Sequence, residues 1–524
     1  MTQDTAALYN AYASRDARFD GVFYIGVTST GIYCRPVCTA RTPKAANCRF
    51  FDSAAEAEKA NFRPCLRCRP ELAPGNAPVD NAARIAALIA QRIDEGMLDD
   101  GAGMERIARE LGWSPRQIRR IAHKELGVSP MELLQTRRLL LAKQLLTETA
   151  LPITQIAFAS GFASLRRFND AFGVRYGMPP THLRRAASGA PGVGASPNTL
   201  TLRLSYRPAF DWAGILRFLG ARAMRGVECV DDDAYVRAVQ LGGHTGWVRV
   251  RHVPEQRGLA VDVAYALVPA LPALLGRLRH LFDLSARPDI VAAQLGQSGI
   301  LADSVARNRG LRVPGAFDGF ELAVRAVLGQ QITVKAATTL AGRFAEAFGA
   351  PIETPYAAVN RLTPTAQRVA AASVSDVASL GIIRTRAQSI VSLAQAIAGG
   401  DITLEPGADP QPTMERLVAL PGIGRWTAEY IAMRALRWPD AFLYGDVALH
   451  KALGGVTAAR AEEMSHAWRP WRSYATLHLW ALNANVSSDR KADAAGRRRS
   501  PAVRSAPLPA GATPTPRRRP VRRG

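Results

Sequence analysis

Four of the six cysteines form two close pairs near the N-terminus. Three residues separate the members of the first pair, two separate those of the second, and 26 residues lie between the pairs. In a reducing compartment such pairs suit metal ligation better than disulfides, and Zn²⁺ prefers four thiolates in a tetrahedron. The spacing predicts one zinc ion bound by Cys34, Cys38, Cys65 and Cys68. Closed four-thiolate sites are most often structural, so a zinc site that only stabilises a small domain is one interpretation.

A second group of residues that could do chemistry lies near the C-terminus. In the sequence Leu-Pro-Gly-Ile-Gly-Arg-Trp-Thr-Ala, Gly422 and Gly424 allow a tight turn with exposed N–H groups. A helix that begins near Arg425 would add its positive N-terminus, so the turn can hold a DNA phosphate. Asp446 follows Trp426 by twenty residues. An Asp before an apolar helical run is most often an N-cap, and a carboxylate held in that way can also serve in catalysis.

Several folding units must position these residues, because 524 residues exceed one hydrophobic core. We expect a multidomain α+β protein. Its parts are a small zinc-bound domain, an all-α double helix-turn-helix unit, a linker, an α+β subdomain, an all-α helix-hairpin-helix domain and a disordered basic tail. The expected boundaries are, in that order, 1–78, 79–187, 188–198, 199–300, 301–487 and 488–524.

Two stretches of the α+β subdomain alternate in the manner of half-buried strands. The first stretch has apolar residues at every second position from Leu200 to Leu204. In the second, Leu259, Val261, Val263 and Tyr265 follow the same period. We therefore expect a sheet with interspersed helices, with one apolar face on each strand.

The formal net charge of +23 favours a polyanionic partner. The last 36 residues contribute +9, from eleven Lys or Arg against two Asp, so the remainder is basic too. No apolar run is long enough to span a bilayer, and no secretory signal is visible. We expect a cytoplasmic, nucleoid-associated protein of bacterial type that binds double-stranded DNA and no membrane.

The residues around the cysteines resemble a known repair domain. Gly-Ile-Tyr-Cys-Arg-Pro at Cys34 and Phe-Arg-Pro-Cys-Leu-Arg-Cys at Cys65 are similar to the N-terminal domain of the Ada family, which repairs methylphosphotriesters in DNA. The resemblance covers roughly residues 5–75 and implies that Cys34 accepts the methyl group. Cys48 lies outside both pairs, and we expect it to be buried. Candidate phosphate contacts, which could equally be ordinary surface residues, are Arg41, Arg63 and Arg67.

A zinc-thiolate site also has the electrostatics that such chemistry needs. A thiolate bound in an anionic cluster stays deprotonated at neutral pH and can attack a methyl carbon. Methylation removes one negative charge, and a less anionic cluster should bind DNA more tightly. Repair at Cys34 could therefore act as a signal.

A repeated helix-turn-helix pattern follows the cysteine-rich unit. The second copy, with Gly-Phe-Ala-Ser-Leu-Arg-Arg-Phe-Asn, looks like the second half of an AraC-type DNA-binding domain, and the likeness spans most of residues 82–185. It implies two helices in successive major grooves, whereas a helical bundle with solvated arginines is the simpler interpretation. Binding at a promoter would make the protein a transcriptional activator, with RNA polymerase as a further partner. Candidate base-reading residues are Arg116, Arg119, Arg166, Arg167 and Asn169.

From about residue 195 to residue 484 the chain resembles the AlkA-type 3-methyladenine DNA glycosylases of the helix-hairpin-helix superfamily. The resemblance implies that Asp446 is catalytic, with a base pocket formed by Trp426, Tyr430 and Trp480, although aromatic residues at helical spacing are usually core. It also implies DNA contacts at Gly422, Gly424 and Arg425. A monovalent cation is implied at the carbonyl oxygens of Val418, Leu420 and Ile423.

Three departures from the family patterns refine this hypothesis. Bifunctional relatives have a strand-cleaving lysine where this chain has Trp426, so we expect a monofunctional enzyme that leaves an abasic site. Gln331 stands where a relative inserts leucine into the duplex gap, which weakens its assignment as a wedge. No cysteine follows Cys229, so O6-methylguanine repair is not expected.

The sequence thus predicts DNA alkylation repair by a DNA-3-methyladenine glycosylase II-type enzyme, joined to a stoichiometric methylphosphotriester methyltransferase and a transcriptional regulator. The alternative is a methylation-responsive activator whose glycosylase-like half only binds DNA.

Overall fold

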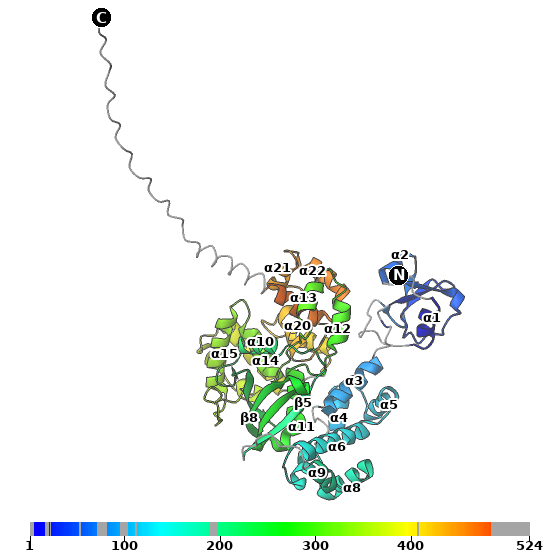
Figure 1. The fold of residues 1–524 in the computed structure, drawn as a ribbon. Helices are drawn as coiled ribbons and strands as arrows, with labels where there is room; N and C mark the ends of the chain where they lie inside the picture. The colour runs from blue at the N-terminus through cyan, green and yellow to red at the C-terminus, as the bar shows by residue number, and fades with distance from the viewer. Residues whose placement is uncertain are drawn as a thin grey trace.

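The structure, a computed structural model, is described for most of the chain (Figure 1). Most of the expected linker at 188–198 and of the tail at 488–524 lies outside the described residues. Among the described helices, none combines the length and the apolar character needed to cross a membrane. The described residues are 5–15, 20, 23–51, 54–70, 81–94, 103–110, 113–187, 198–405, 408–483 and 524.

The N-terminal unit is a small sheet between two helices. Its strand order is β3-β1-β2-β4, in which β2 and β4 pair in parallel and the other neighbours are antiparallel. Aromatic side chains, among them Phe23, Tyr33 and Phe62, are the largest apolar groups of its buried core. The elements are α1 (Thr5–Ala13), β1 (Tyr24–Val27), β2 (Ile32–Cys34), β3 (Cys48–Phe51), α2 (Ala54–Lys59) and β4 (Arg63–Pro64).

Seven helices follow, in two similar halves joined by the long α6. Helices α5 and α6 begin with capping boxes at Ser114 and Ser129, and α5 and α8 end at left-handed glycines, Gly127 and Gly177. The helices are α3 (Asn81–Asp94), α4 (Gly103–Glu110), α5 (Pro115–Leu126), α6 (Pro130–Glu148), α7 (Ile153–Ala159), α8 (Leu165–Tyr176) and α9 (Pro180–Ala187).

A five-stranded antiparallel sheet forms the α+β subdomain, with strand order β5-β9-β8-β7-β6. The predicted apolar faces are confirmed, because Leu200, Leu202 and Leu204 on β5 and Leu259, Val261 and Val263 on β9 are buried. The strands are β5 (Thr199–Ser205), β6 (Glu228–Asp231), β7 (Ala234–Leu241), β8 (His244–Val253) and β9 (Gly258–Ala264).

The prediction for Tyr265 is wrong. β9 ends at Ala264, and Tyr265 begins the 3₁₀ helix η6 (Tyr265–Ala270) with 39% of its surface exposed. Its hydroxyl donates a hydrogen bond to Gln155 of α7. The residue continues the apolar period of the strand by type, but the extended backbone ends at Ala264, directly before it.

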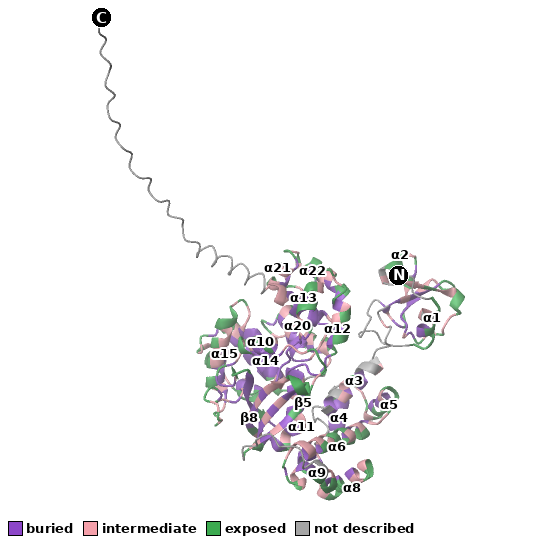
Figure 2. Cartoon of the chain, in the orientation of Figure 1, coloured by how far each residue is buried: buried purple, intermediate pink, exposed green. Residues whose placement is uncertain are grey.

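The rest of the chain is helical and packs against the sheet and around a second core. Figure 2 shows buried residues concentrated on the sheet and α14, whereas α5 and α8 carry many exposed ones. The helices are α10 (Trp212–Gly220), α11 (Leu271–Leu281), α12 (Pro288–Leu295), α13 (Ala302–Arg307), α14 (Gly319–Leu328), α15 (Val334–Phe348), α16 (Ala366–Ala370), α17 (Val374–Ala378), α18 (Arg384–Ala398), α19 (Pro410–Val418), α20 (Arg425–Arg434), α21 (Val447–Ala452), α22 (Ala458–Ser465) and a last helix at 472–483.

A buried ion-pair network joins the sheet to the helical domain. Arg237 of β7 donates to Glu321 of α14 at 2.8 Å, and Arg325 of α14 bonds both Glu321 and Glu228 of β6. Burial would raise the pKa of Glu321, but the two guanidinium groups outweigh it and lower the pKa to about 2. The network therefore fixes α14 against the β6 and β7 side of the sheet.

We predict that Glu321→Ala lowers the free energy of unfolding by about 3 kcal/mol, because it removes the nearest carboxylate of the buried Arg237 and leaves only the more distant Glu228. Urea denaturation followed by tryptophan fluorescence measures the loss. The control is Glu405→Ala, which removes the partly exposed pair with Arg277 and should cost less than about 1 kcal/mol. Equal losses in the two variants would contradict the assignment.

Candidate functional site

Asp446 caps the N-terminus of α21. Its Oδ1 accepts hydrogen bonds from the backbone N–H groups of Ala448 at 2.9 Å and Leu449 at 3.0 Å. Capping restricts the side chain to one orientation, and the helix dipole favours its negative charge. The predicted N-cap role is therefore present.

Two indole groups also donate hydrogen bonds to the same carboxylate. Trp480, on the last helix, donates its Nε1–H to Oδ1 at 3.2 Å, and Trp426, in the first turn of α20, donates to Oδ2 at 3.3 Å. The structure thus brings together three of the residues that the sequence predicted for the active site. Asp446 is partly exposed, so the carboxylate is rigidly held and still accessible.

These residues face a cavity of about 450 Å³ between α14, α15 and α20. The ring of Tyr430 stacks on that of Trp426, with centroids 5.4 Å apart and planes inclined by 4°. Aliphatic residues of α14 and α15 line the facing wall. The cavity is large enough for a planar base, and Tyr430 is part of its wall as predicted.

Arginines at one end of the cavity were not predicted. Arg434 is buried and donates to the Tyr430 hydroxyl at 2.7 Å, and Arg222 and Arg325 also line the cavity. Burial would raise the pKa of Tyr430, but the charges of these three arginines outweigh it and lower the pKa. These residues come from three separate segments, so no local pattern could have identified them.

The predicted hairpin lies directly beside the cavity, between α19 and α20. Gly422 adopts φ +74°, and a Cβ there would come within 2.3 Å of the Ser389 hydroxyl of α18. Gly424 is the N-cap of α20 and has no capping side chain, so the first N–H groups of that helix face outward. Both glycines are exposed, as an anion-binding turn requires.

The loop that carries Gln331 is fastened to this hairpin. The side chain of Gln330 donates to the Gly422 carbonyl at 3.0 Å and to the Thr427 hydroxyl at 3.1 Å. Gln331 itself is exposed and adopts φ +54°, an unusual conformation for a residue other than glycine. The role of Gln330 was missed, because a contact across 92 residues leaves no local signal.

Arg425 and Asp440 both take part in ion pairs, one partly exposed and one buried. The guanidinium of Arg425 bonds Glu429 at 3.2 Å and Glu462 at 3.3 Å, although 59% of its side chain is exposed. Asp440 is buried in a bidentate ion pair with Arg472. Of the two aspartates in this region, Asp446 lines the cavity and Asp440 does not.

The predicted cysteines lie together in the N-terminal unit. Their sulfur atoms are all within 4.8 Å of one another, and all are buried. Hydrogen bonds and the nearby charges of Cys38 and Cys68 hold the pKa of Cys34 above its usual range, while the pKa of Cys38 falls to about 2. Four buried sulfur atoms this close together fit a site that a divalent cation completes, and Zn²⁺ accepts this donor set. Cys48 is half-buried and lies outside the cluster.

A buried ion pair lies next to the cysteine cluster. Arg35, fully buried between Cys34 and Cys38, donates its Nε–H to Asp20 at 2.7 Å. The sequence did not reveal this role, because Asp20 is distant along the chain. The three predicted phosphate-binding residues of the unit are exposed; they are Arg41, Arg63 and Arg67.

The predicted base-reading residues lie on the outer faces of two helices. Arg116 and Arg119 are exposed on α5, as are Arg166, Arg167 and Asn169 on α8. On α8 the opposite face is buried through Phe168 and Phe172. The exposed rows are thus arranged as a surface that can enter a DNA groove.

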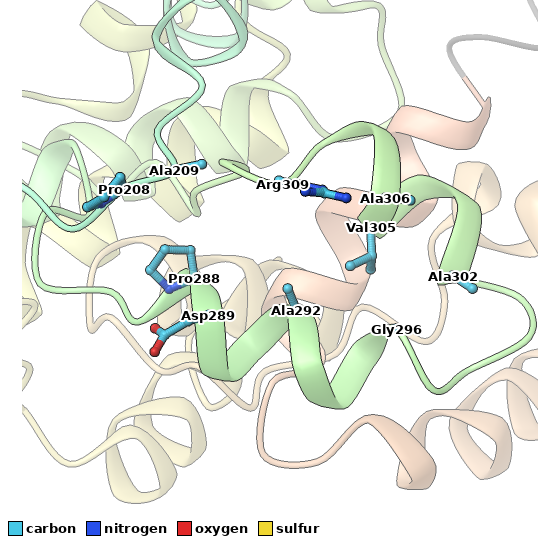
Figure 3. Close-up of a pocket in the computed structure, with 10 residues that line it drawn as sticks. All are labelled: Pro208, Ala209, Pro288, Asp289, Ala292, Gly296, Ala302, Val305, Ala306 and Arg309. Atoms are coloured by element: carbon cyan, nitrogen blue, oxygen red, sulfur yellow. The ribbon is translucent and has the colours of Figure 1, made fainter. Parts of the chain in front are cut away.

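A separate hollow of about 430 Å³ lies between α12 and α13 (Figure 3). Its walls are mostly small and apolar. Its one carboxylate, Asp289, pairs with Arg287 at 2.8 Å. None of its lining residues belongs to the cavity at Asp446, and we assign no chemistry to it.

Four family models match consecutive parts of the chain. The metal-binding domain of Ada matches residues 7–71 and a helix-turn-helix domain matches 107–186. The AlkA N-terminal domain matches 201–318, and the HhH-GPD superfamily of base excision DNA repair proteins matches 324–473. The predicted order of units is therefore confirmed.

One relative matches nearly the whole chain. The "probable bifunctional transcriptional activator/DNA repair enzyme AlkA" of Mycobacterium tuberculosis is 39% identical over 92% of this chain and 97% of its own length. The chain belongs to this bifunctional AlkA family. In this chain an Ada-type zinc-binding domain and a helix-turn-helix domain precede a glycosylase of the HhH-GPD type.

Two shorter relatives each match one half of the bifunctional AlkA chain. The "DNA-3-methyladenine glycosylase 2" of Escherichia coli is 36% identical over 53% of this chain and 95% of its own length. The "bifunctional transcriptional activator/DNA repair enzyme AdaA" of Bacillus subtilis is 33% identical over 34% of this chain and 81% of its own. The chain therefore combines a DNA-binding regulator and a repair enzyme.

A buried carboxyl group beside the hairpin generates a pH prediction. Burial raises the pKa of Glu429 from 4.5 to about 7, despite the nearby Arg425. The folded state then binds more protons than the unfolded state between these values, so stability falls as pH rises through this window. We predict that the melting temperature decreases between about pH 5 and pH 8, and that Glu429→Gln flattens this decrease. Thermal melts at several pH values measure both.

The control is Glu463→Gln, which removes an exposed carboxylate paired with Arg460. This variant should keep the wild-type dependence on pH. An unchanged slope in Glu429→Gln would show that another group causes the decrease.

Proposed function

We propose that the chain excises alkylated purines of the 3-methyladenine type from DNA, with Asp446 as the catalytic residue. The observation that carries this proposal is the carboxylate fixed by two indole N–H groups and a helix N-terminus at the mouth of an aromatic cavity. A base turned out of the duplex would occupy the cavity, which would place its sugar beside Asp446.

The carboxylate stabilises the positive charge that develops on C1′ as the base leaves. The C1′–N bond breaks, and its electron pair leaves with the cationic base, which becomes neutral. A water oxygen then bonds C1′ and loses one proton to Asp446 or to solvent. The product is a free base and an abasic site, because Trp426 offers no amine that could form a Schiff base.

Base selection depends on the aromatic wall. The stacked pair of Trp426 and Tyr430 presents an electron-rich face, which attracts a cationic purine more than a neutral one. An alkylated base that is already a good leaving group needs only modest assistance. The hairpin glycines and Arg425 hold the phosphate backbone, and Gln331 fills the gap that the flipped nucleotide leaves.

A monovalent cation would strengthen the hold on the backbone. The carbonyl oxygens of Val418, Leu420 and Ile423 come from one tight turn, in which Leu420 accepts a hydrogen bond from Ile423 at 3.3 Å. Carbonyl oxygens are suitable ligands for hard cations. The bound charge would face a DNA phosphate.

The N-terminal unit accepts a methyl group from a DNA methylphosphotriester at Cys34. The sulfur attacks the methyl carbon, and the bond between that carbon and the ester oxygen breaks. The oxygen stays on phosphorus with the electron pair, so the phosphodiester regains its negative charge. The zinc ion would be held by the four cysteines and keeps their sulfurs deprotonated. Arg41, Arg63 and Arg67 are suited to hold the neighbouring phosphates.

The helix-turn-helix unit directs the protein to promoter DNA. Methylation lowers the negative charge of the cysteine cluster and so strengthens DNA binding, which would lead to contact with RNA polymerase and activation of the alkylation response. Such binding places the protein on the nucleoid. In the alternative, the glycosylase half only clamps DNA.

We predict that Asp446→Asn lowers the rate of 3-methyladenine and 7-methylguanine release from methylated duplex DNA by about a hundredfold or more, because the neutral amide cannot stabilise the developing charge. Binding to a duplex with an abasic-site analogue should persist. Released bases are measured by chromatography, and the product strand should break only in alkali.

Asp289→Asn, an exposed site in the same half, serves as the control and should retain full release. Failure of the wild-type protein to release either base would favour the clamp.

We predict that incubation with methylphosphotriester DNA adds a single methyl group to Cys34, because its sulfur is the nucleophile. Mass spectrometry of the tryptic peptides locates the added mass. Cys48→Ser should react as the wild type does, whereas Cys34→Ser should remain unmodified. A methyl group on any other cysteine, or none at all, would support a purely structural zinc site.

A further inference from the structure

The helix-turn-helix unit is docked on an open edge of the sheet. Within the sheet β5 pairs with β9 alone, so its other side is an edge. On that side the Gln144 side chain of α6 donates to the Arg203 carbonyl at 2.7 Å, and the Arg203 N–H donates to Glu148 at 3.1 Å. Two side chains of α6 thus make the backbone hydrogen bonds of Arg203 that a neighbouring strand would otherwise make.

Apolar packing extends this contact. α7 lies against η6, where Tyr265 bonds Gln155, and α3 lies against α11. Buried residues of α6 and α8, such as Leu145 and Phe168, belong to the same apolar cluster as Leu202 of β5. A shared core predicts that the two units move as one body, although their chain connection at 188–197 lies outside the described residues.

The catalytic helices are attached on the opposite side of the sheet. Glu228 of β6, the other edge strand, bonds Arg325 of α14, and Gly226 beside it forms a bridge with Val359. Five strands at the usual spacing place the two edges roughly 19 Å apart. In Figure 1 α8 and α9 lie at one end of this body, α20 and α21 lie at the other, and β5 and α11 lie between them.

The reading face of α8 points away from the sheet. Its inner face is buried through Phe168 and Phe172 towards α6 and α7, while Arg166 and Arg167 are exposed on the outer face. Duplex DNA is stiff over roughly 150 base pairs. A short duplex that lies on the outer face of α8 therefore cannot bend back to the cavity beside Asp446.

We propose that one chain binds two DNA segments at the same time, one on the helix-turn-helix unit and one at the glycosylase cavity, with the sheet as a rigid spacer. The inference rests on the proposed function, since it takes both surfaces as DNA-binding. Binding to undamaged DNA would then hold the repair half near a second segment and raise the local concentration of that segment.

The test uses the full chain and two short duplexes. One is undamaged and attached to beads, and the other is fluorescent and contains an abasic-site analogue. The wild type should retain the fluorescent duplex on the beads, and native mass spectrometry should show one chain with one copy of each. Replacement of Arg166 and Arg167 by glutamate should abolish retention, whereas Lys143→Glu, an exposed change on α6, should preserve it.

The outcomes separate this inference from the proposed function. If each duplex binds alone but displaces the other, the two-segment proposal is wrong and the proposed function stands. If neither duplex binds and no base is released, the proposed function fails first.

Rigidity is tested by energy transfer between dyes on the two duplexes. The double variant Gln144→Ala, Glu148→Ala should broaden the distance distribution, because it removes the contacts to Arg203. A matched control is Gln411→Ala, Glu415→Ala, which removes an exposed Gln–Glu hydrogen bond of the same spacing on α19. Equal distributions in all three proteins would overturn the rigid spacer.

Discussion

Under the proposed mechanism a single carboxylate, Asp446, has to be fixed and accessible at the same time, and its surroundings in the glycosylase half meet that requirement. Asp446 meets it with two backbone N–H groups and two indole N–H groups, all between 2.9 and 3.3 Å. The donors come from three segments, so the core of the helical domain must form before the site exists. These hydrogen bonds hold the carboxylate in one orientation and leave it accessible from the cavity.

The buried and half-buried arginines of this half have two different kinds of partner. Arg237 and Arg325 are neutralised in place by Glu228 and Glu321, and so they stabilise the junction between sheet and helices. Arg434 instead donates to backbone carbonyls and the Tyr430 hydroxyl. Since this end of the cavity is positive, attraction for a cationic base must come from the aromatic faces and from Asp446.

Much of the site could be predicted from the sequence, because its parts depend on local geometry. The cysteine spacing and the glycines of the hairpin reflect short-range constraints on ligand and backbone positions, whereas the expected roles of Trp426 and Asp446 came from the resemblance to a glycosylase family. Alternation also located β5 and β9, and failed at Tyr265, where the backbone turns while the residue type stays apolar. Contacts between distant segments, such as those of Arg35, Gln330 and Gln144, leave no periodic signal and needed the structure.

The link between Gln330 and the hairpin has a consequence for how lesions are found. Because Gly422 is packed against Ser389 and bonded to Gln330, the phosphate-holding turn and the tip of the neighbouring loop are separated by a fixed span. Only a duplex that bends to match this span can engage both. Damaged and poorly stacked steps bend at lower energetic cost, so under the proposed function such steps would engage the turn and the loop together more readily than intact DNA.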